Sequence, residues 1–409
     1  MPELDTDTHP ATPDVAAPQR RSTLRRFYGY KLATEMSFLS VIWVIYLRER
    51  GYSLTEIGLS ESAFHLAPIL LEIPSGSFAD LVGRRWSLAI GAGLIAASHA
   101  LLWSAASLPV VMLAMFLHGA SYSFRSGADQ AYLYEALGDE RGRYAGIFGQ
   151  LLGAMYLVAA ASAWLGAFLS DTSYSLPFAL TIGFGLAGVW LALSLAEPPR
   201  THHTQHATMR TLVRRHANDA WQLLRSNRTV AALLVFSGPF WAASAIAHMY
   251  LQAAFSDRGL SNSSVGLILA GGLVLSALGA ALAGRVDRWR RFAWQVSGLA
   301  TIIGLGLALT GVRVTAIATV AYLVASLAGG IVEPLLSNWF NRQLPSEQRA
   351  TLLSVESWTF SVTMIVAFPL AGQLAERAGW GALFIAVGLV NLALAVAVII
   401  AGRRNGRVS

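Results

Sequence analysis

Cysteine is absent from the 409 residues, so disulfide bonds and thiol chemistry are excluded. Charge is also scarce: Asp, Glu, Lys and Arg make up 13% of the chain, against about 25% in soluble domains. Hydrophobic residues make up 55%, and the mean hydropathy is +0.51. A water-soluble protein of this composition lacks the polar surface to cover itself. We therefore expect a lipid bilayer to surround most of the chain.

Lysine is almost missing, because Lys31 is the only one and arginine carries nearly all of the positive charge. The net charge of +7 is compatible with nucleic-acid binding, but the arginines lie in short loops between apolar runs. That pattern sets membrane topology, so we expect no nucleic-acid partner. The predicted outer loops hold few arginines: Arg48, Arg50, Arg258, Arg313 and Arg377. This asymmetry predicts both termini on the cytosolic side of a bacterial inner (plasma) membrane.

Nucleotide-binding glycine loops and metal-ligand clusters are also missing from the sequence. We therefore expect no enzyme and no metal or organic cofactor. We expect a proton gradient to supply the energy. A transporter-like sensor is an alternative class of protein. It would need a large soluble domain, whereas the longest extramembrane segment here is a short central linker.

Apolar runs long enough to cross a bilayer need about 20 residues. They cover about 25–47, 55–79, 86–106, 109–137, 144–169, 175–196, 229–255, 264–284, 292–311, 314–341, 350–375 and 380–402. The pattern predicts an all-α membrane protein of twelve transmembrane helices. Its expected parts are a disordered cytosolic tail, a six-helix bundle, a cytosolic linker with an amphipathic helix, a second six-helix bundle and a short tail, at 1–23, 24–196, 197–228, 229–402 and 403–409.

Two landmarks of the first bundle recur in the second. Asp80 recurs as Asp287, and Leu137 recurs as Leu344, both 207 positions later. A common offset indicates two related bundles. Parallel repeats with a site between them are the architecture of alternating access.

The segment between the second and third runs reads Gly76-Ser-Phe-Ala-Asp80-Leu-Val-Gly83-Arg84-Arg85. It resembles the loop signature of the major facilitator superfamily, and the hydropathy of residues 25–402 is similar to the pattern of that family. The two glycines permit a tight turn and close helix approach. The resemblance implies a transporter of a small molecule, expected to be a monomer. It also implies that Asp80 and Arg84 hold the two halves together in the outward-facing state. The alternative is that Arg84 and Arg85 only set topology.

The chain departs from the drug–proton antiporters of this family at two places. Met115 stands where those proteins have the arginine of an R-x-x-x-G motif, and the fifth run has Gly146, Gly149 and Gly153 but no proline. A more distant efflux branch or another substrate class is therefore open.

Ionised side chains near the bilayer centre cost roughly 2.5–3.5 kcal/mol each, so those within the apolar runs are candidates for function. The resemblance implies that the first, fourth, seventh and tenth helices line the central cavity. It thereby assigns Glu35, Arg125, Asp129 and Glu333 to the substrate- and proton-binding site. Glu356, in the eleventh run, is a further candidate.

The spacing of Arg125 and Asp129 places both on one face of a continuous helix. Arg125 would keep one carboxylate ionised, while a second, less well paired carboxylate takes up and releases a proton. A fixed salt bridge between Arg125 and Asp129 is the alternative. Two other acids have structural interpretations: we expect Glu61 to be solvated at the outer mouth, and Glu72 to bond backbone groups freed by Pro74.

The acids in the apolar runs outnumber Arg125, which favours a cationic ligand. The sequence therefore predicts a secondary transporter that exports small amphipathic or cationic compounds in exchange for protons. The alternative is a proton symporter that imports a small anionic nutrient, with Arg125 as its anchor.

Overall fold

A computed structural model describes residues 17–197, 228–286, 292–343 and 346–405, together with residues 222 and 225. Its helices are α1 (Ala17–Glu35), α2 (Trp43–Glu49), α3 (Leu54–Leu81), α4 (Arg84–Ser104), α5 (Leu108–Arg125), α6 (Ala128–Ala136), η1 (Gly138–Arg143), α7 (Tyr144–Ser170), α8 (Ser175–Leu193), α10 (Arg228–Ser256), α11 (Asn262–Val286), α12 (Phe292–Thr310), α13 (Thr315–Gln343) and α14 (Ser346–Asn405).

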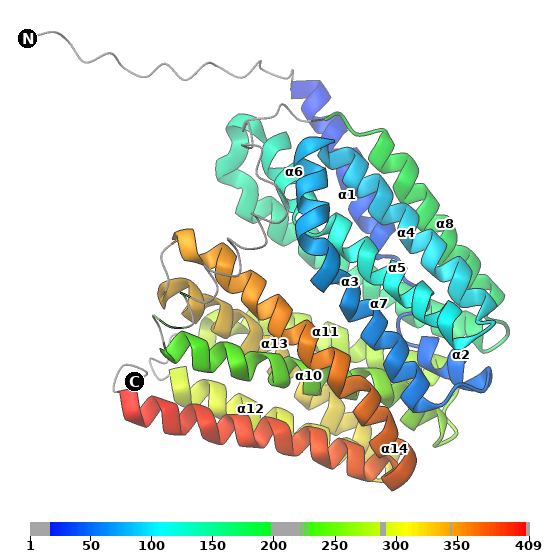
Figure 1. Ribbon diagram of the computed structural model, residues 1–409, viewed down its shortest axis with the longest axis vertical. Helices are drawn as coiled ribbons and strands as arrows, with labels where there is room; N and C mark the ends of the chain where they lie inside the picture. The colour runs from blue at the N-terminus through cyan, green and yellow to red at the C-terminus, as the bar shows by residue number, and fades with distance from the viewer. Residues whose placement is uncertain are drawn as a thin grey trace, which may run out of the picture.

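The helices form two bundles, an N-terminal half of α1 to α8 and a C-terminal half of α10 to α14 (Figure 1). The halves meet at the end where α2 lies and diverge toward the end that carries the two termini (Figure 1). Two helix pairs join them side by side, α3 with α14 and α7 with α11. Large apolar side chains such as Leu157, Leu186 and Trp190 are exposed on the outside, as a lipid-facing surface requires.

Twelve crossings result when α1 with α2 and α5 with α6 each count as one, and α14 counts as two. Glycine at position 379, with a φ of +83°, separates the two crossings of α14. Among the described residues, seven helices are long and apolar enough to span a membrane by length and composition alone. The predicted all-α fold of two six-helix bundles is confirmed.

The first crossing is broken, whereas the sequence predicted one continuous helix over 25–47. Between α1 and α2 the chain makes turns, and its backbone polar groups bond to other helices. The N–H of Phe38 donates to Thr181 of α8 at 3.2 Å. Gln252 of α10 accepts from the N–H of Val44 at 3.3 Å and donates to the carbonyl of Ser40 at 3.2 Å. Non-helical backbone is tolerated at membrane depth where it is buried in protein like this.

Charged and polar contacts close the end of the molecule near α2. Arg48 donates to Asp257 at 2.5 Å, and Asp257 also accepts from the indole N–H of Trp380 at 2.9 Å. Thr55 at the start of α3 donates through its hydroxyl to Glu376 of α14 at 2.7 Å. The arginine asymmetry predicts that this is the outer end, as it is called below, and the structure is closed there.

Tyr174, in the turn before α8, adds to the same closure. Its hydroxyl donates to Glu49 at 3.0 Å and accepts from Asn262 of the C-terminal half at 3.0 Å. Burial raises the pKa of the Tyr174 hydroxyl, and the Glu49 carboxylate adds to the rise. The hydroxyl therefore stays protonated and keeps both bonds. Beside it, the N–H of Ser263 donates to the Asp171 carboxylate at 3.3 Å.

Some expected boundaries differ or fall outside the described residues. Helix α1 begins at Ala17, within the expected tail 1–23, and α14 continues to Asn405, within the expected tail 403–409. Most of the expected linker 197–228 lies outside the described residues, as do Asp287 and Leu344 of the internal repeat. The amphipathic helix and the repeat therefore remain predictions.

Candidate functional site

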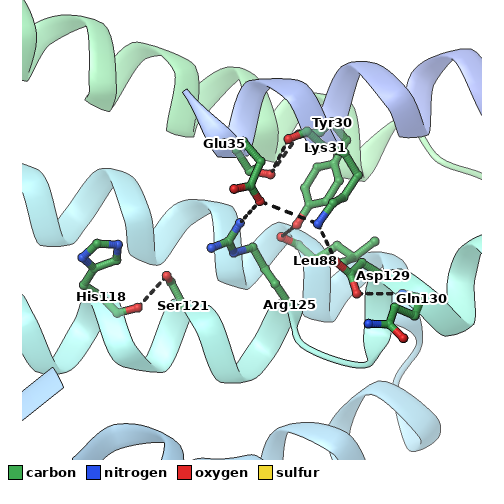
Figure 2. Close-up of polar contacts among 10 residues, drawn as sticks. Tyr30, Lys31, Glu35, Leu88, His118, Ser121, Arg125, Asp129 and Gln130 are labelled. Carbon is green, nitrogen blue, oxygen red and sulfur yellow. Dashed lines mark hydrogen bonds and ion pairs between the residues drawn. The ribbon is translucent and has the colours of Figure 1, made fainter. Parts of the chain in front are cut away.

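Four charged side chains of the N-terminal half meet in one group, the ion cluster of Lys31, Glu35, Arg125 and Asp129 (Figure 2). The Nζ of Lys31 lies 2.5 Å from an Asp129 oxygen and 3.7 Å from a Glu35 oxygen. Arg125 Nη1 lies 3.5 Å from the same Glu35 oxygen. The cations and carboxylates thus alternate in the order Arg125, Glu35, Lys31, Asp129, so each acid has a cationic partner.

The cluster is partly shielded from solvent. Exposed fractions of the side chains are 7% for Lys31, 14% for Arg125 and Asp129, and 29% for Glu35. Of the two acids in the cluster, Glu35 is therefore the more accessible to a ligand or a proton. Ion pairs that are shielded in this way interact strongly but lose the solvation of their charges.

A chain break positions Arg125 and Asp129, so the expected continuous helix over 109–137 is wrong. Helix α5 ends at Arg125, Gly127 has a φ of +74°, and α6 begins at Ala128. Positive φ is readily adopted by glycine. The break places Asp129 in the first turn of α6, where the helix dipole favours a carboxylate. Arg125 and Asp129 therefore pair with different partners, and the alternative of a direct salt bridge between them is also wrong.

Lys31 is the cluster residue that the sequence analysis did not include among the candidates. Its position four residues before Glu35, on the same helical face, was the available signal. Arg125 fits beside α4 because Gly91 leaves room: a Cβ at position 91 would lie 2.5 Å from the Arg125 Cγ. The Nε of Arg125 is buried without a hydrogen-bond partner among the described residues.

A cavity of about 210 Å³ lies in the C-terminal half, and Tyr156 of α7 contributes to its lining. Its polar and aromatic lining comprises Tyr156, Trp241, Ser244, His248, Ser276, Tyr322, Ser326 and Glu333. His248 and Tyr322 are hydrogen-bonded at 2.9 Å between ring nitrogen and hydroxyl. The remaining lining is apolar, so the cavity suits a ligand with an apolar body and a few polar groups.

Glu333 of α13, the tenth crossing, lies in the wall of this cavity. Within the part of the chain that the structure describes, it forms no ion pair, in contrast to the acids of the ion cluster. Tyr156 is within electrostatic reach of both Glu333 and Glu35, and Glu356 of α14 is within reach of Glu333. The five predicted site residues therefore form two groups, Glu35, Arg125 and Asp129 in one half and Glu333 and Glu356 in the other.

The predicted conformational-gate loop is tied to its own half. Arg84 lies 3.4 Å from Asp80 and bonds both oxygens of Glu135 of α6 at 2.8 Å. Gly83, with a φ of +133°, turns the chain so that the N–H groups of Arg84 and Arg85 donate to Glu197 at 2.6 and 3.2 Å. These contacts all lie within the N-terminal half. A contact from this loop to the other half, expected for the outward-facing state, remains a prediction.

The expected environments of two further acids differ from the structure. Glu61 was expected to be solvated, but its side chain is only 16% exposed and lies 3.7 Å from His65. Glu72 was expected to bond the backbone near Pro74, but its Oε2 is buried and has no hydrogen-bond partner among the described residues. Gly76 was expected to permit close helix approach, but a Cβ there would meet nothing within 4 Å.

A fold of two pseudo-symmetric six-helix bundles, with an ion cluster in one and a cavity in the other, is that of a polytopic membrane transporter. The chain belongs to the major facilitator superfamily, whose family model matches residues 32–256 and 244–408. An uncharacterized MFS-type transporter, YxaM of Bacillus subtilis (strain 168), is 25% identical over 389 residues, which cover 90% of this chain and 92% of that relative. The predicted family and the membrane-transporter class are thereby confirmed.

Solved structures of transporters share the fold. The nucleoside transporter NupG superposes with a TM-score of 0.77 at 16% identity, over 93% of this chain and 98% of NupG. The xylose transporter XylE from E. coli, in an inward open conformation, gives a TM-score of 0.68 at 14% identity, over 93% of this chain and 96% of XylE. At these identities the likeness concerns the fold alone.

Proposed function

We propose that this protein is a proton-coupled antiporter that exports small amphipathic or cationic compounds across the inner membrane by alternating access. The observation that carries the proposal is Glu333, an acid without an ion-pair partner among the described residues, in a cavity of aromatic, hydroxyl and apolar side chains. An uncompensated carboxylate in such a wall attracts a cation. The aromatic faces of Trp241 and Tyr156 add cation–π and stacking surface.

Glu333 and Glu356 supply the exchange between proton and substrate. When both are ionised, the carboxylates of Glu333 and Glu356 repel each other. Either a proton or the cationic group of a ligand relieves this repulsion, and the two compete because the same oxygens take both. Competition for one carboxylate gives antiport: a proton arriving from outside displaces the substrate, and a substrate arriving from the cytosol displaces the proton.

The ion cluster has a different part in this proposal. Its acids are already neutralised by Lys31 and Arg125, so it is a poor site for a cationic ligand. Arg125 is likewise engaged with Glu35, which argues against its use as the anchor of an anionic nutrient. We infer that the cluster instead holds α1 against α5 and α6.

The test is transport by the purified protein in proteoliposomes that contain a pH-sensitive dye. An imposed pH gradient is combined with an aromatic monocation, with an anionic analogue of similar size, or with a nucleoside. Of the three compounds, we expect only the monocation to be exchanged for protons that move down the gradient. Glu333→Gln should lower this exchange roughly 10-fold or more, since hydrogen bonds to charged groups contribute about 1.5–3 kcal/mol.

Glu140→Gln is the matched control, because Glu140 is an acid whose ion pair with Arg143, at 2.6 Å, lies in the exposed turn η1. It should exchange like the unmodified protein. Proton movement in the same direction as the anionic analogue would favour the import of an anionic nutrient. Gradient-driven uptake of the nucleoside would instead favour nucleoside import by this protein; NupG is a nucleoside transporter. Either result, or monocation exchange that survives Glu333→Gln, would overturn the proposal.

A further inference from the structure

A second group of titratable side chains lies on α3, away from both the ion cluster and the cavity. Glu61 and His65 are one helical turn apart, and His65 Nε2 lies 3.7 Å from Glu61 Oε1. Their side chains are 16% and 8% exposed. Buried ionisable residues within a membrane-spanning helix are costly to keep and usually functional. The proposed transport site uses neither residue.

The pair lies where the two halves touch. The imidazole of His65 packs against two phenyl rings of α14, with centroid distances of 5.4 Å to Phe360 and 5.9 Å to Phe368. Beside it, the hydroxyl of Ser62 donates to the carbonyl of Ile365 at 2.8 Å. One turn closer to the outer end, a Cβ at Gly58 would lie 2.6 Å from the carbonyl oxygen of Phe368, so the two helices are in close contact. Separation of the halves at the outer end would break these contacts and admit water.

The other titratable groups on the helices near α3 are few, or already have hydrogen-bond or ion-pair partners. His118 of α5 packs against Phe64, and His99 of α4 packs against His118. Tyr250 of α10 is within electrostatic reach of Glu61. The Tyr250 hydroxyl donates to the carbonyl of Phe368 at 2.8 Å. On α14, Glu376 is bonded by Thr55, and Glu356 lies one turn beyond Phe360 toward the inner end. On α2, Arg48 pairs with Asp257 and Glu49 accepts from Tyr174. None of these contacts places a cation on Glu61.

The burial of Glu61 and His65 beside phenyl rings determines the protonation state of the pair. An ionised Glu61 beside a neutral His65 would leave one uncompensated charge in this apolar contact, which is strongly unfavourable. One added proton makes the pair neutral overall. A separation of 3.7 Å is longer than the roughly 2.7–2.9 Å of a charge-assisted hydrogen bond, which favours a neutral carboxylic acid beside a neutral imidazole. The proton therefore belongs on Glu61.

We propose that Glu61 and His65 form a second proton-binding site, located between α3 and α14, which holds its proton while the outer ends of the two halves are in contact and releases it when they separate. Proton binding and outer closure then favour each other, because the coupling between two linked equilibria is reciprocal. The site would let protons act on the conformational step itself. This inference does not rest on the identity of the substrate or on Glu333.

The experiment uses infrared difference spectroscopy on the purified full-length protein without substrate. The natural absence of cysteine allows Asp171→Cys and Ser263→Cys to be joined across the halves with a short, reducible bifunctional thiol reagent. The carbonyl-stretch band of a protonated carboxylic acid is then followed as the buffer is changed from acid to alkaline. We expect the cross-linked protein to retain one such band at alkaline pH and to lose it when the cross-link is reduced.

Two sets of variants assign that band. Glu61→Gln should abolish it, whereas Glu35→Gln and Glu333→Gln should leave it in place. If Glu61→Gln does not fold, Glu61→Asp serves instead and should shift the frequency of the band without removing it. His65→Gln should retain the band, because the carboxyl group holds the proton. A band that Glu61→Gln or Glu61→Asp leaves unchanged would overturn the proposal, as would loss of the band in the cross-linked protein at the same pH as in the free protein.

Discussion

The ammonium group of Lys31 lies 2.5 Å from a carboxylate oxygen of Asp129, and the bond joins the first crossing to the short helix that follows Gly127. Lys31 and Asp129 are 98 residues apart in sequence. Both side chains are nearly buried, at 7% and 14% exposed. The bond fixes α6 against α1, and thereby also positions Glu135 for its contact with Arg84. It connects the ion cluster to the loop that carries the family signature.

Removal of one member of this pair should lower the stability of the fold more than removal of both. Lys31→Met leaves the Asp129 carboxylate buried without its cation, and breaking a buried pair in this way costs about 3–5 kcal/mol. The double variant Lys31→Met with Asp129→Asn removes both charges and should recover most of that loss. Thermal unfolding in detergent micelles measures the effect. Additive losses in the double variant would show that the two side chains do not interact.

The family, the number of crossings and the placement of most helices were predictable from the sequence, because hydropathy and the Gly76–Arg85 segment report on lipid and on local turns. The breaks in the first and fourth crossings were not. The break near Phe38 is stabilised by Thr181 and by Gln252, and these partners lie 143 and 208 residues away from the groups that they bond. A local hydropathy pattern does not contain such tertiary bonds.

The sequence indicated which charged residues could form a site, but not how they pair. Glu35, Arg125 and Asp129 do lie together, and Glu333 does line a cavity. The partner of Asp129 was missed because Lys31 occurs in a segment of arginines, whose density indicated topology. Glu61 was misplaced because distance along the helix does not show that α14 covers it. Depth in the membrane is readable from sequence, whereas burial by another helix depends on how the two halves pack.

Arg84 should not tolerate replacement by lysine. Its guanidinium bonds both oxygens of Glu135 at 2.8 Å and also lies near Asp80, a two-pronged contact that a single ammonium group does not reproduce. We expect Arg84→Lys to lower the free energy of unfolding by about 1.5–3 kcal/mol, the range for hydrogen bonds to charged groups. Arg143→Lys is the control, since Arg143 has an exposed partner in Glu140. Equal unfolding temperatures for the two variants would contradict this assignment.

Two glycines of α7 should respond differently to the same substitution. A Cβ at Gly166 would overlap the carbonyl of Phe38, which is held in place by the break in the first crossing. A Cβ at Gly153 would meet nothing within 4 Å. Overpacking typically costs about 1–3 kcal/mol, so Gly166→Ala should lower the unfolding temperature while Gly153→Ala leaves it unchanged or raises it. If Gly166→Ala unfolds like the unmodified protein, the close approach of α7 to Phe38 is incorrect.

Asp257 should control how firmly the outer end is closed. It accepts from Arg48 of the other half at 2.5 Å and from Trp380 at 2.9 Å, so it ties the first crossing to the turn within α14. The side chains of Arg48 and Asp257 are 35% and 40% exposed, and exposed ion pairs contribute only about 0.2–1 kcal/mol. Asp257→Asn should therefore shift the population toward outer opening by at most about fivefold, a change in equilibrium rather than a loss of folding.

A single reporter cysteine at Ser62 measures this shift, because Ser62 lies in the α3–α14 contact and the chain has no other cysteine. In the variant Ser62→Cys, a membrane-impermeant thiol reagent should react up to about fivefold faster when Asp257→Asn is added. Arg48→Gln should accelerate it similarly, and the double variant should be no faster than either single one, since both remove the same bond. Glu140→Gln, which breaks an exposed ion pair within one half, should leave the rate unchanged. A rate that does not rise in Asp257→Asn would show that outer closure depends on the apolar contact of α3 with α14 rather than on this charged one.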